Sequence, residues 1–194
     1  DTLRAALNAK RVAEGISPWS QRQGDRVISK TVNLLQDPTV GPFSCPFDDE
    51  GMHTQHLVLV EDGTVRSWYG DLTHGSTGNG IRPGLGSYPT PGLINLLVTP
   101  GNLTWDALVA QQQDAIIVDQ VLGEGGDITG DLSISLELGY RVSQGEIVGR
   151  VKDTMVSGNA YSALNHLIAL GSDLKWSGST YTPSVAVNGL SITG

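Results

Sequence analysis

The sequence has little with which to build a cross-linked, membrane-spanning or nucleic-acid-binding protein. Its single cysteine, Cys45, excludes a disulfide within the chain, which fits a reducing, cytoplasmic compartment. No apolar run approaches the ~20 residues that a membrane-spanning helix needs, and we expect no signal peptide. The 12 Lys and Arg residues are outnumbered by 20 Asp and Glu residues, which gives a net charge of −8. Since no run of basic residues offsets this balance, we expect neither nucleic acid nor a membrane as a partner.

Motifs for metal binding and nucleophilic catalysis are also missing. HExxH, HExxxH, CxxC and GxSxG do not occur. His53 and His56 lie at the start of a predicted strand, where residues three apart point to opposite faces and cannot hold one ion together. The acidic residues 48–50 and 123–131 contain calcium-type ligands without the spacing of an EF-hand loop, so we interpret them as solvated turns, with calcium as the alternative. From the residues alone, the chain is a binding or structural domain.

Turn signals predict a strand-rich fold. The 25 glycines favour many tight turns. Asp62-Gly63 and Gln144-Gly145 each lie between two runs of strand-forming residues, which predicts two hairpins. A third pair of strands, residues 185–187 and 190–192, is predicted around Asn188-Gly189.

Helices are expected at three places between these strands. Residues 2–14 carry apolar side chains at helical spacing, and so do residues 102–113, where Thr104 is the expected N-cap. A late helix is predicted over residues 159–170, with Gly171 as its C-cap. These elements predict an α+β fold with mostly antiparallel sheets, hairpins and a few peripheral helices. No polar linker divides the chain, so we expect one domain over residues 1–194.

Several short motifs follow one another in an order that is similar to that of a known family. They are residues 47–51 (FDDEG), the hairpin at Asp62-Gly63, and residues 76–80 (STGNG), 129–133 (TGDLS), 144–147 (QGEI), 157–159 (SGN), 170–173 (LGSD), 178–184 (GSTYTPS) and 187–190 (VNGL). This series resembles the C-terminal part of TldD/PmbA proteins, historically labelled modulators of DNA gyrase. The residues themselves support no link with gyrase.

The resemblance implies a metallopeptidase of two subunits that acts on unfolded or extended peptides. In that family the TldD-type subunit carries HExxxH and a late cysteine ligand, whereas the PmbA-type subunit, also called TldE, lacks them. Here HExxxH is absent, and residues 175–184, which fill the region of the late cysteine, contain none. The resemblance therefore implies a PmbA-type chain that is inactive alone and binds no cofactor, with zinc only in a TldD-type partner. It also implies an N-terminal domain that is not part of this chain.

The resemblance also implies a partner and a substrate. The partner is a TldD-type subunit or a second copy of this chain, for which apolar residues Leu57, Leu59, Trp68 and Tyr69 of the first hairpin are candidate contacts. The substrate is an extended peptide held by main-chain hydrogen bonds at free strand edges. Glycines would allow its close approach, although they could equally serve turns. The candidate substrate-binding residues are Thr77, Gly78, Asn79, Gly80, Thr129, Gly130, Asp131, Gly158 and Asn159.

A second function class stays open. The chain could be a stand-alone, strand-rich binding module with no proteolytic role. The two hypotheses differ in the gene that they expect, because a family member needs a sizeable domain upstream of this one. Reading the full open reading frame would separate them.

Overall fold

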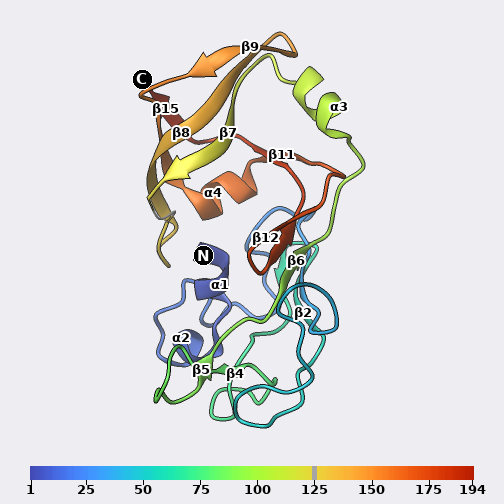
Figure 1. The fold of residues 1–194 in the computed structure, drawn as a ribbon, viewed down its shortest axis with the longest axis vertical. Coiled ribbons are helices and arrows are strands. Elements are labelled where there is room, and N and C mark those ends of the chain that lie inside the picture. The colour runs from blue at the N-terminus through green and yellow to red at the C-terminus, as the bar shows by residue number, and fades with distance from the viewer. Residues whose placement is uncertain (124–125) are drawn as a thin grey trace. The chain divides into compact units, whose positions relative to one another are not determined.

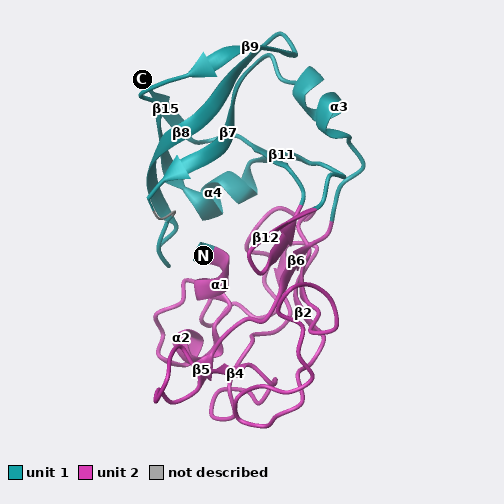
Figure 2. Cartoon of the chain, viewed as in Figure 1, with its two compact units in different colours: residues 1–2, 100–174, 183–194 teal, residues 3–99, 175–182 magenta. Residues whose placement is uncertain are grey.

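The computed structural model describes residues 1–123 and 126–194, and its internal contacts divide the chain into two compact units (Figure 2). Unit 1 contains residues 1–2, 100–174 and 183–194, and unit 2 contains residues 3–99 and 175–182. Each unit is therefore assembled from segments that are distant in sequence. Each has a sheet of its own, and the two are described separately below.

Unit 2 contains a six-stranded sheet with the order β12-β13-β6-β1-β2-β3. Its neighbouring strands are antiparallel except for β13 and β6, which run parallel. A separate two-stranded sheet joins β4 to β5, and two short helices begin the chain (Figure 1). The elements are α1 (Thr2–Ala6), α2 (Ala9–Ala13), β1 (Leu34–Gln36), β2 (Leu57–Glu61), β3 (Thr64–Val65), β4 (Gly80–Ile81), β5 (Thr90–Pro91), β6 (Leu96–Val98), β12 (Lys175–Ser177) and β13 (Thr180–Thr182).

The first predicted hairpin is confirmed and supplies much of the core of unit 2. Asp62 and Gly63 have φ values of 49° and 71°, as a type I′ turn requires. On the strand before this turn, Leu59 is fully buried while its neighbour Val58 is 38% exposed. This alternation places Leu59 on the inner face of the sheet. Leu57 and Tyr69, which we expected to contact a partner, are also buried and belong to the core instead.

The single helix predicted over residues 2–14 is wrong, because Asn8 divides it into α1 and α2. Asn8 has an extended backbone, and its side-chain oxygen accepts hydrogen bonds from the N–H groups of Lys10 and Arg11. A side chain that caps a new helix in this way competes with continuation of the first one. The break also lets Leu7 and Asn8 approach Tyr69, whose N–H donates to the Leu7 carbonyl at 3.2 Å.

Unit 1 is built on a five-stranded antiparallel sheet with the order β15-β10-β8-β7, in which β9 also pairs with β8. A second, two-stranded sheet joins β11 to β14, and two short helices accompany the strands (Figure 1). The elements are α3 (Trp105–Ala110), β7 (Asp114–Leu122), β8 (Asp131–Ser143), β9 (Glu146–Val151), β10 (Met155–Asn159), α4 (Ala160–Asn165), β11 (Leu167–Leu170), β14 (Val185–Val187) and β15 (Ser191–Thr193).

The hairpin predicted at Gln144-Gly145 is confirmed, with φ values of 51° and 80° between β8 and β9. The hairpin predicted at Asn188-Gly189 is wrong. Its two strands exist, but β14 pairs with β11 and β15 pairs with β10. Two three-residue strands paired only with each other would bury little, whereas the observed pairing sets Ile192 opposite the buried Val156.

The two later predicted helices are shorter than expected. Thr104 is the N-cap of α3, as predicted, and its hydroxyl accepts from the N–H of Ala107 at 3.3 Å. The late helix begins after Asn159 but ends at Asn165, and Leu167–Leu170 forms strand β11. A short apolar run fits either element, so pairing with β14 decides its structure. The α+β class is nevertheless confirmed, since antiparallel strands dominate and the helices are few and short.

No helix among residues 1–123 and 126–194 is both long enough and apolar enough to cross a membrane.

The hairpin of unit 2 gives a direct test of the core. We expect Leu59→Ala to lower the free energy of unfolding by about 2–5 kcal/mol, because it leaves a cavity in a closed core. Val58→Ala, on the outer face of the same strand, should lower the free energy of unfolding by less than about 1 kcal/mol. Urea unfolding followed by tryptophan fluorescence measures both. Equal effects would show that Leu59 lies outside the core.

Candidate functional site

The predicted residues of unit 2 centre on a pair of fully buried amides, Gln36 and Asn79. Asn79 Nδ2 donates to Gln36 Oε1 at 2.7 Å, and Gln36 Nε2 donates back to Asn79 Oδ1 at 3.1 Å. Asn79 Nδ2 also donates to the carbonyl of Gly92 at 2.9 Å. A buried amide is stable only when its polar atoms have partners, and here the partners belong to the chain itself. Asn79 therefore connects β1, through Gln36, to the loop of residues 79–92, and it also holds the two ends of that loop together through the carbonyl of Gly92.

The glycines of the same motif are packed against the chain. At Gly78 φ is +73°, and a Cβ atom would lie 2.2 Å from the carbonyl oxygen of His53. A Cβ atom at Gly80 would lie 2.1 Å from a carboxylate oxygen of Glu50. Thr77 closes the loop beside them, since its hydroxyl oxygen accepts from the N–H of Gly70 at 2.8 Å. The close approach that these glycines permit is thus made by the protein's own atoms.

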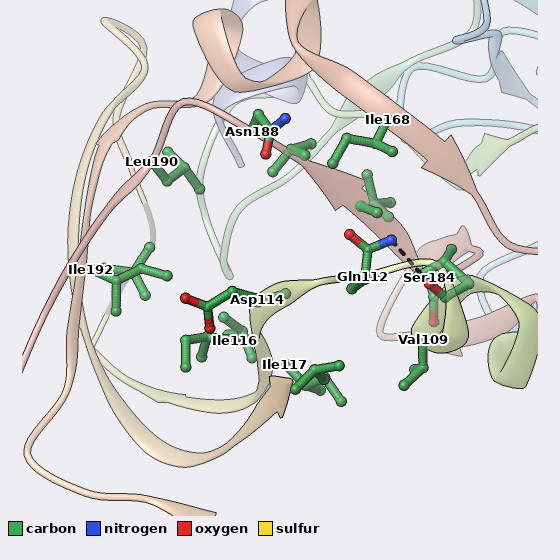
Figure 3. A pocket seen from close by; sticks show the side chains of 18 of the residues that line it. Val109, Gln112, Asp114, Ile116, Ile117, Ile168, Ser184, Asn188, Leu190 and Ile192 are labelled. Carbon is green, nitrogen blue, oxygen red and sulfur yellow. Dashed lines mark hydrogen bonds between the residues drawn. The ribbon is translucent and has the colours of Figure 1, made fainter. Parts of the chain in front are cut away.

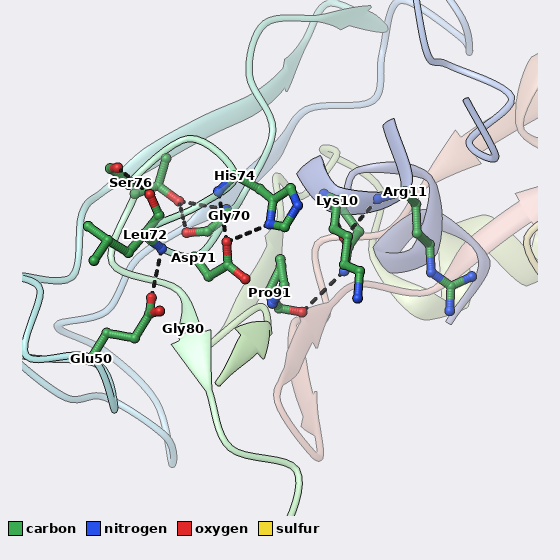
Figure 4. Close-up of polar contacts among 12 residues, drawn as sticks. Lys10, Arg11, Glu50, Gly70, Asp71, Leu72, His74, Ser76, Gly80 and Pro91 are labelled. Carbon is green, nitrogen blue, oxygen red and sulfur yellow. Dashed lines mark hydrogen bonds and ion pairs between the residues drawn. The ribbon is translucent and has the colours of Figure 1, made fainter. Parts of the chain in front are cut away.

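The acidic stretch at residues 48–50 is not the solvated turn that we predicted. Asp48 is buried, and its carboxylate accepts from the N–H groups of Glu50, Met52 and Gly80 at 2.8–2.9 Å. Glu50 accepts from the N–H of Leu72 at 2.7 Å (Figure 4). These carboxylates take the place of secondary structure in holding the loops together. Of the second acidic stretch, residues 124 and 125 lie outside the described residues.

A buried carboxylate also orients a histidine in unit 2. Asp71, with 7% of its side chain exposed, lies 2.7 Å from Nδ1 of His74 and accepts from the His74 N–H at 2.8 Å (Figure 4). His74 lines an open cavity of about 440 Å³ together with Trp68 and Thr77. Thr77 is therefore the one predicted site residue that lines this cavity.

The predicted residues of unit 1 meet where β8 and β10 pair. Asn159 lies opposite Asp131, and its Nδ2 donates to Asp131 Oδ1 at 2.9 Å and to the carbonyl of Thr129 at 3.0 Å. The Asn159 side-chain oxygen caps α4 by accepting from Tyr161 and Ser162. Thr129, Asp131 and Asn159 thus form a local cluster, and the predicted set of residues divides into two clusters, one in each unit.

Side chains of the protein itself fill the space beside the two predicted glycines of unit 1, Tyr161 beside Gly130 and Leu190 beside Gly158. A Cβ atom at Gly130, where φ is +86°, would lie 2.6 Å from the Tyr161 ring, and one at Gly158 would lie 2.8 Å from Leu190. The Tyr161 hydroxyl donates to the carbonyl of Ile128 at 2.8 Å. Burial, with a smaller effect of the nearby Asp127 charge, raises the pKa of Tyr161 to about 12.

A cavity of about 430 Å³ in unit 1 was not predicted (Figure 3). Its walls are mainly branched apolar side chains from α3, β7, β11, β14 and β15, and none of the predicted site residues lines it. In the sequence these side chains follow the same pattern as core residues, so no signal distinguishes them. The most exposed of them are Val118, Ile168, Val185 and Ile192, each 44–47% exposed.

The described residues do not fit a zinc ion, because no group of three or more His, Cys, Asp or Glu side chains among them is placed to hold a metal. Burial and the charges of Asp48 and Asp49 raise the pKa of the Cys45 thiol, which disfavours the thiolate that metals bind. The region expected for a late cysteine forms the hairpin of β12 and β13, where Trp176 stacks on Tyr181 with ring centroids 4.7 Å apart.

Comparisons with known proteins agree on one family. The family model of the PmbA/TldA metallopeptidase C-terminal domain matches residues 1–194. A metalloprotease PmbA homolog of Haemophilus influenzae is 33% identical over 78% of this chain and 33% of that protein. A metalloprotease TldD homolog of Buchnera aphidicola is 27% identical over 84% of this chain and 35% of that protein.

A solved structure supports the same relationship. A proposed modulator of a DNA gyrase from Thermotoga maritima has a TM-score of 0.86 and 29% identity, over 97% of this chain and 45% of that one. The chain therefore spans less than half the length of each of these relatives.

The amide pair of unit 2 can be tested by removing one partner. We expect Asn79→Ala to lower the free energy of unfolding by roughly 1–3 kcal/mol or more, because it leaves the side-chain amide of the fully buried Gln36 without its Asn79 partner. Asn102→Ala, at an exposed position, should change it by less than about 0.5 kcal/mol. Urea unfolding measures both. If Asn79→Ala leaves the free energy of unfolding unchanged, Asn79 has no structural role and is again a candidate for ligand binding.

Tyr161 predicts a loss of stability at alkaline pH. Its folded pKa of about 12 lies above the ordinary value of about 10, so the neutral phenol contributes stability that is present below pH ~10 and lost as the pH rises through the folded value. We expect the absorbance difference between wild type and Tyr161→Phe to titrate with a midpoint near 12. A midpoint at the ordinary value would show that the phenol is solvated.

Proposed function

This chain belongs to the PmbA/TldD family of metallopeptidases, whose C-terminal domain it matches, and we propose that it acts as the PmbA-type, non-catalytic partner in a two-subunit zinc peptidase for extended peptides. The observation that carries the proposal is the hairpin at residues 175–184. A thiolate ligand is expected there in a TldD-type chain, and this chain has stacked Trp176 and Tyr181 instead. Zinc would then be bound by the TldD-type partner alone.

The strand edges of unit 1 support a role in holding peptides. Among the described residues, β7 pairs only with β8, and β14 pairs only with β11. Each strand therefore has one edge whose main-chain N–H and C=O groups are not used in a sheet. An extended peptide can add to such an edge with little dependence on its sequence, which suits a peptidase of unfolded segments.

The proposed partner surface differs from the one that the sequence suggested. Leu57, Leu59 and Tyr69 are buried in unit 2 and cannot contact another chain. Large apolar side chains of the same unit that are exposed are better candidates, and the most exposed are Leu85 at 108% and Tyr88 at 90%. Stable interfaces are enriched in apolar and aromatic residues at their centre. We propose that these two residues contact the TldD-type subunit or a second copy of this chain.

A cytoplasmic location belongs to the same proposal. The one thiol, Cys45, has no second cysteine with which to pair, and proteins with free thiols are typical of reducing compartments.

The proposal is tested by combining the full-length protein with a TldD-type chain. Alone, it should contain no stoichiometric zinc and should not cleave an unfolded protein such as reduced casein. The mixture should form a larger species in light scattering and should cleave casein, with loss of cleavage on chelation. Stoichiometric zinc together with peptidase activity in the protein alone would contradict the proposed role.

A matched pair of variants tests the contact surface. We expect Leu85→Glu with Tyr88→Glu to reduce both the larger species and casein cleavage about tenfold or more, because the charges oppose burial in an apolar interface. Ile16→Glu, also an exposed apolar position of unit 2 at 55%, should leave both unchanged. Unaltered association of the double variant would exclude this surface.

A further inference from the structure

We propose that the apolar cavity of unit 1 is a binding subsite for one large aliphatic or aromatic side chain of an extended peptide. The inference rests on the proposed peptide-handling function and deepens it by naming a substrate preference. None of the residues predicted to bind substrate lines this cavity, although the motif at residues 187–190 (VNGL) does.

The size and lining of the cavity determine what it accepts. At about 430 Å³ it falls in the range of roughly 300–1,000 Å³ typical of ligand pockets. Apolar cavities as small as ~150 Å³ already bind a benzene molecule. Side chains such as Ile116, Ile117 and Leu190 surround the space in Figure 3. A leucine, isoleucine or phenylalanine side chain therefore fits it in both volume and polarity.

Charge at the cavity argues against a charged ligand. Among the described residues that line the cavity, Asp114 is the only ionisable one, and its Oδ1 lies 3.4 Å from Nε of Arg141 in an exposed ion pair. The remaining polar lining comes from neutral groups such as Gln112, Ser184 and Asn188. The described lining residues include no Lys, Arg or His that could hold a carboxylate or phosphate. A neutral apolar group is consequently the favoured occupant.

The neighbouring strand edges indicate that the apolar group is presented by a peptide. Ile116, Ile117 and Val118 of β7 and Val185–Val187 of β14 line the cavity. Among the described residues each of these two strands pairs with a single neighbour, β7 with β8 and β14 with β11, so each has one free edge. A peptide next to either edge can satisfy main-chain groups and direct alternate side chains to one face. A fatty acid of similar size has no amide groups with which to form hydrogen bonds to the free edge of β7 or β14, so a peptide is the favoured ligand.

The mouth of the cavity provides positions for testing the proposal. Ile168 of β11 and Ile192 of β15 both line the cavity and are 46% and 47% exposed. An aspartate at either position places a charge beside the apolar ligand without entering a closed core. Ile147 of β9 is similarly exposed at 51% but does not line the cavity, so Ile147→Asp is a matched control.

The test is a titration of the isotope-labelled full-length protein, followed by NMR, with short peptides that are acetylated and amidated at their ends. One peptide carries a single leucine among serines and glycines, and the other has serine in its place. We expect the leucine peptide to shift the amide signals of Ile116, Ile168 and Ile192 and to bind about tenfold or more tightly than the serine peptide. Ile168→Asp and Ile192→Asp should each weaken leucine-peptide binding about tenfold, and Ile147→Asp should leave it within about twofold.

Several results would overturn the proposal. They are equal affinity for the two peptides, shifts confined to other residues, unchanged binding by both cavity variants, and decanoate occupying the cavity while neither peptide does. If the cavity assignment fails in one of these ways but the protein still supports casein cleavage with a TldD-type chain, the proposed function stands without it. Leucine-dependent binding in a protein that never supports cleavage would keep the cavity assignment and remove the proposed function.

Discussion

The buried amide pair of Gln36 and Asn79 fixes the glycine-rich segment of unit 2 to its sheet. Gln36 belongs to β1, in the middle of the six-stranded sheet, and Asn79 immediately precedes β4. Through the carbonyl of Gly92 the same pair also reaches the far end of the loop, beyond β5. Around this link, Asp48 and Glu50 bind main-chain N–H groups of neighbouring loops. Loops with little secondary structure thus gain a defined conformation from side-chain acceptors, because buried main-chain groups need partners.

Several motif residues that we expected to bind substrate have a structural role instead. Asn79 and Asn159 both use their amide groups to hold chain segments together. Gly78 and Gly130 lie where a Cβ atom would collide with the protein itself. Polar and glycine motifs are therefore explained by the fold at these positions before any ligand is considered. Thr77 has a structural role, since it binds the N–H of Gly70, and it also lines the cavity in unit 2, so it remains a candidate for ligand binding.

The sequence predicted what depends on neighbouring residues and failed where distant segments decide the structure. The hairpins at Asp62-Gly63 and Gln144-Gly145 follow from two residues that accept positive φ values. Asn188-Gly189 has the same signal, but its flanking strands pair elsewhere. The helix expected over residues 159–170 likewise ends early, at Asn165, because Leu167–Leu170 forms strand β11 and pairs with β14. Local sequence patterns determine which backbone conformations are favourable, and pairing with distant strands determines which of them is formed.

Metal binding and peptide binding place different demands on a chain, and this difference explains how a relative could keep one without the other. A zinc site needs three or four ligands in fixed geometry, so the loss of a single cysteine or histidine removes it. An apolar cavity and a free strand edge are built by many residues, each of which contributes a little. In this chain residues 175–182 form a hairpin, and residues 175–184 contain no cysteine. Among the described residues, β7 and β14 each have an unpaired edge, and both strands contribute apolar side chains to the wall of the cavity. Under the proposed function, the features that hold a peptide persist in a chain without the ligands for catalysis, and their pattern in the sequence is that of an ordinary core.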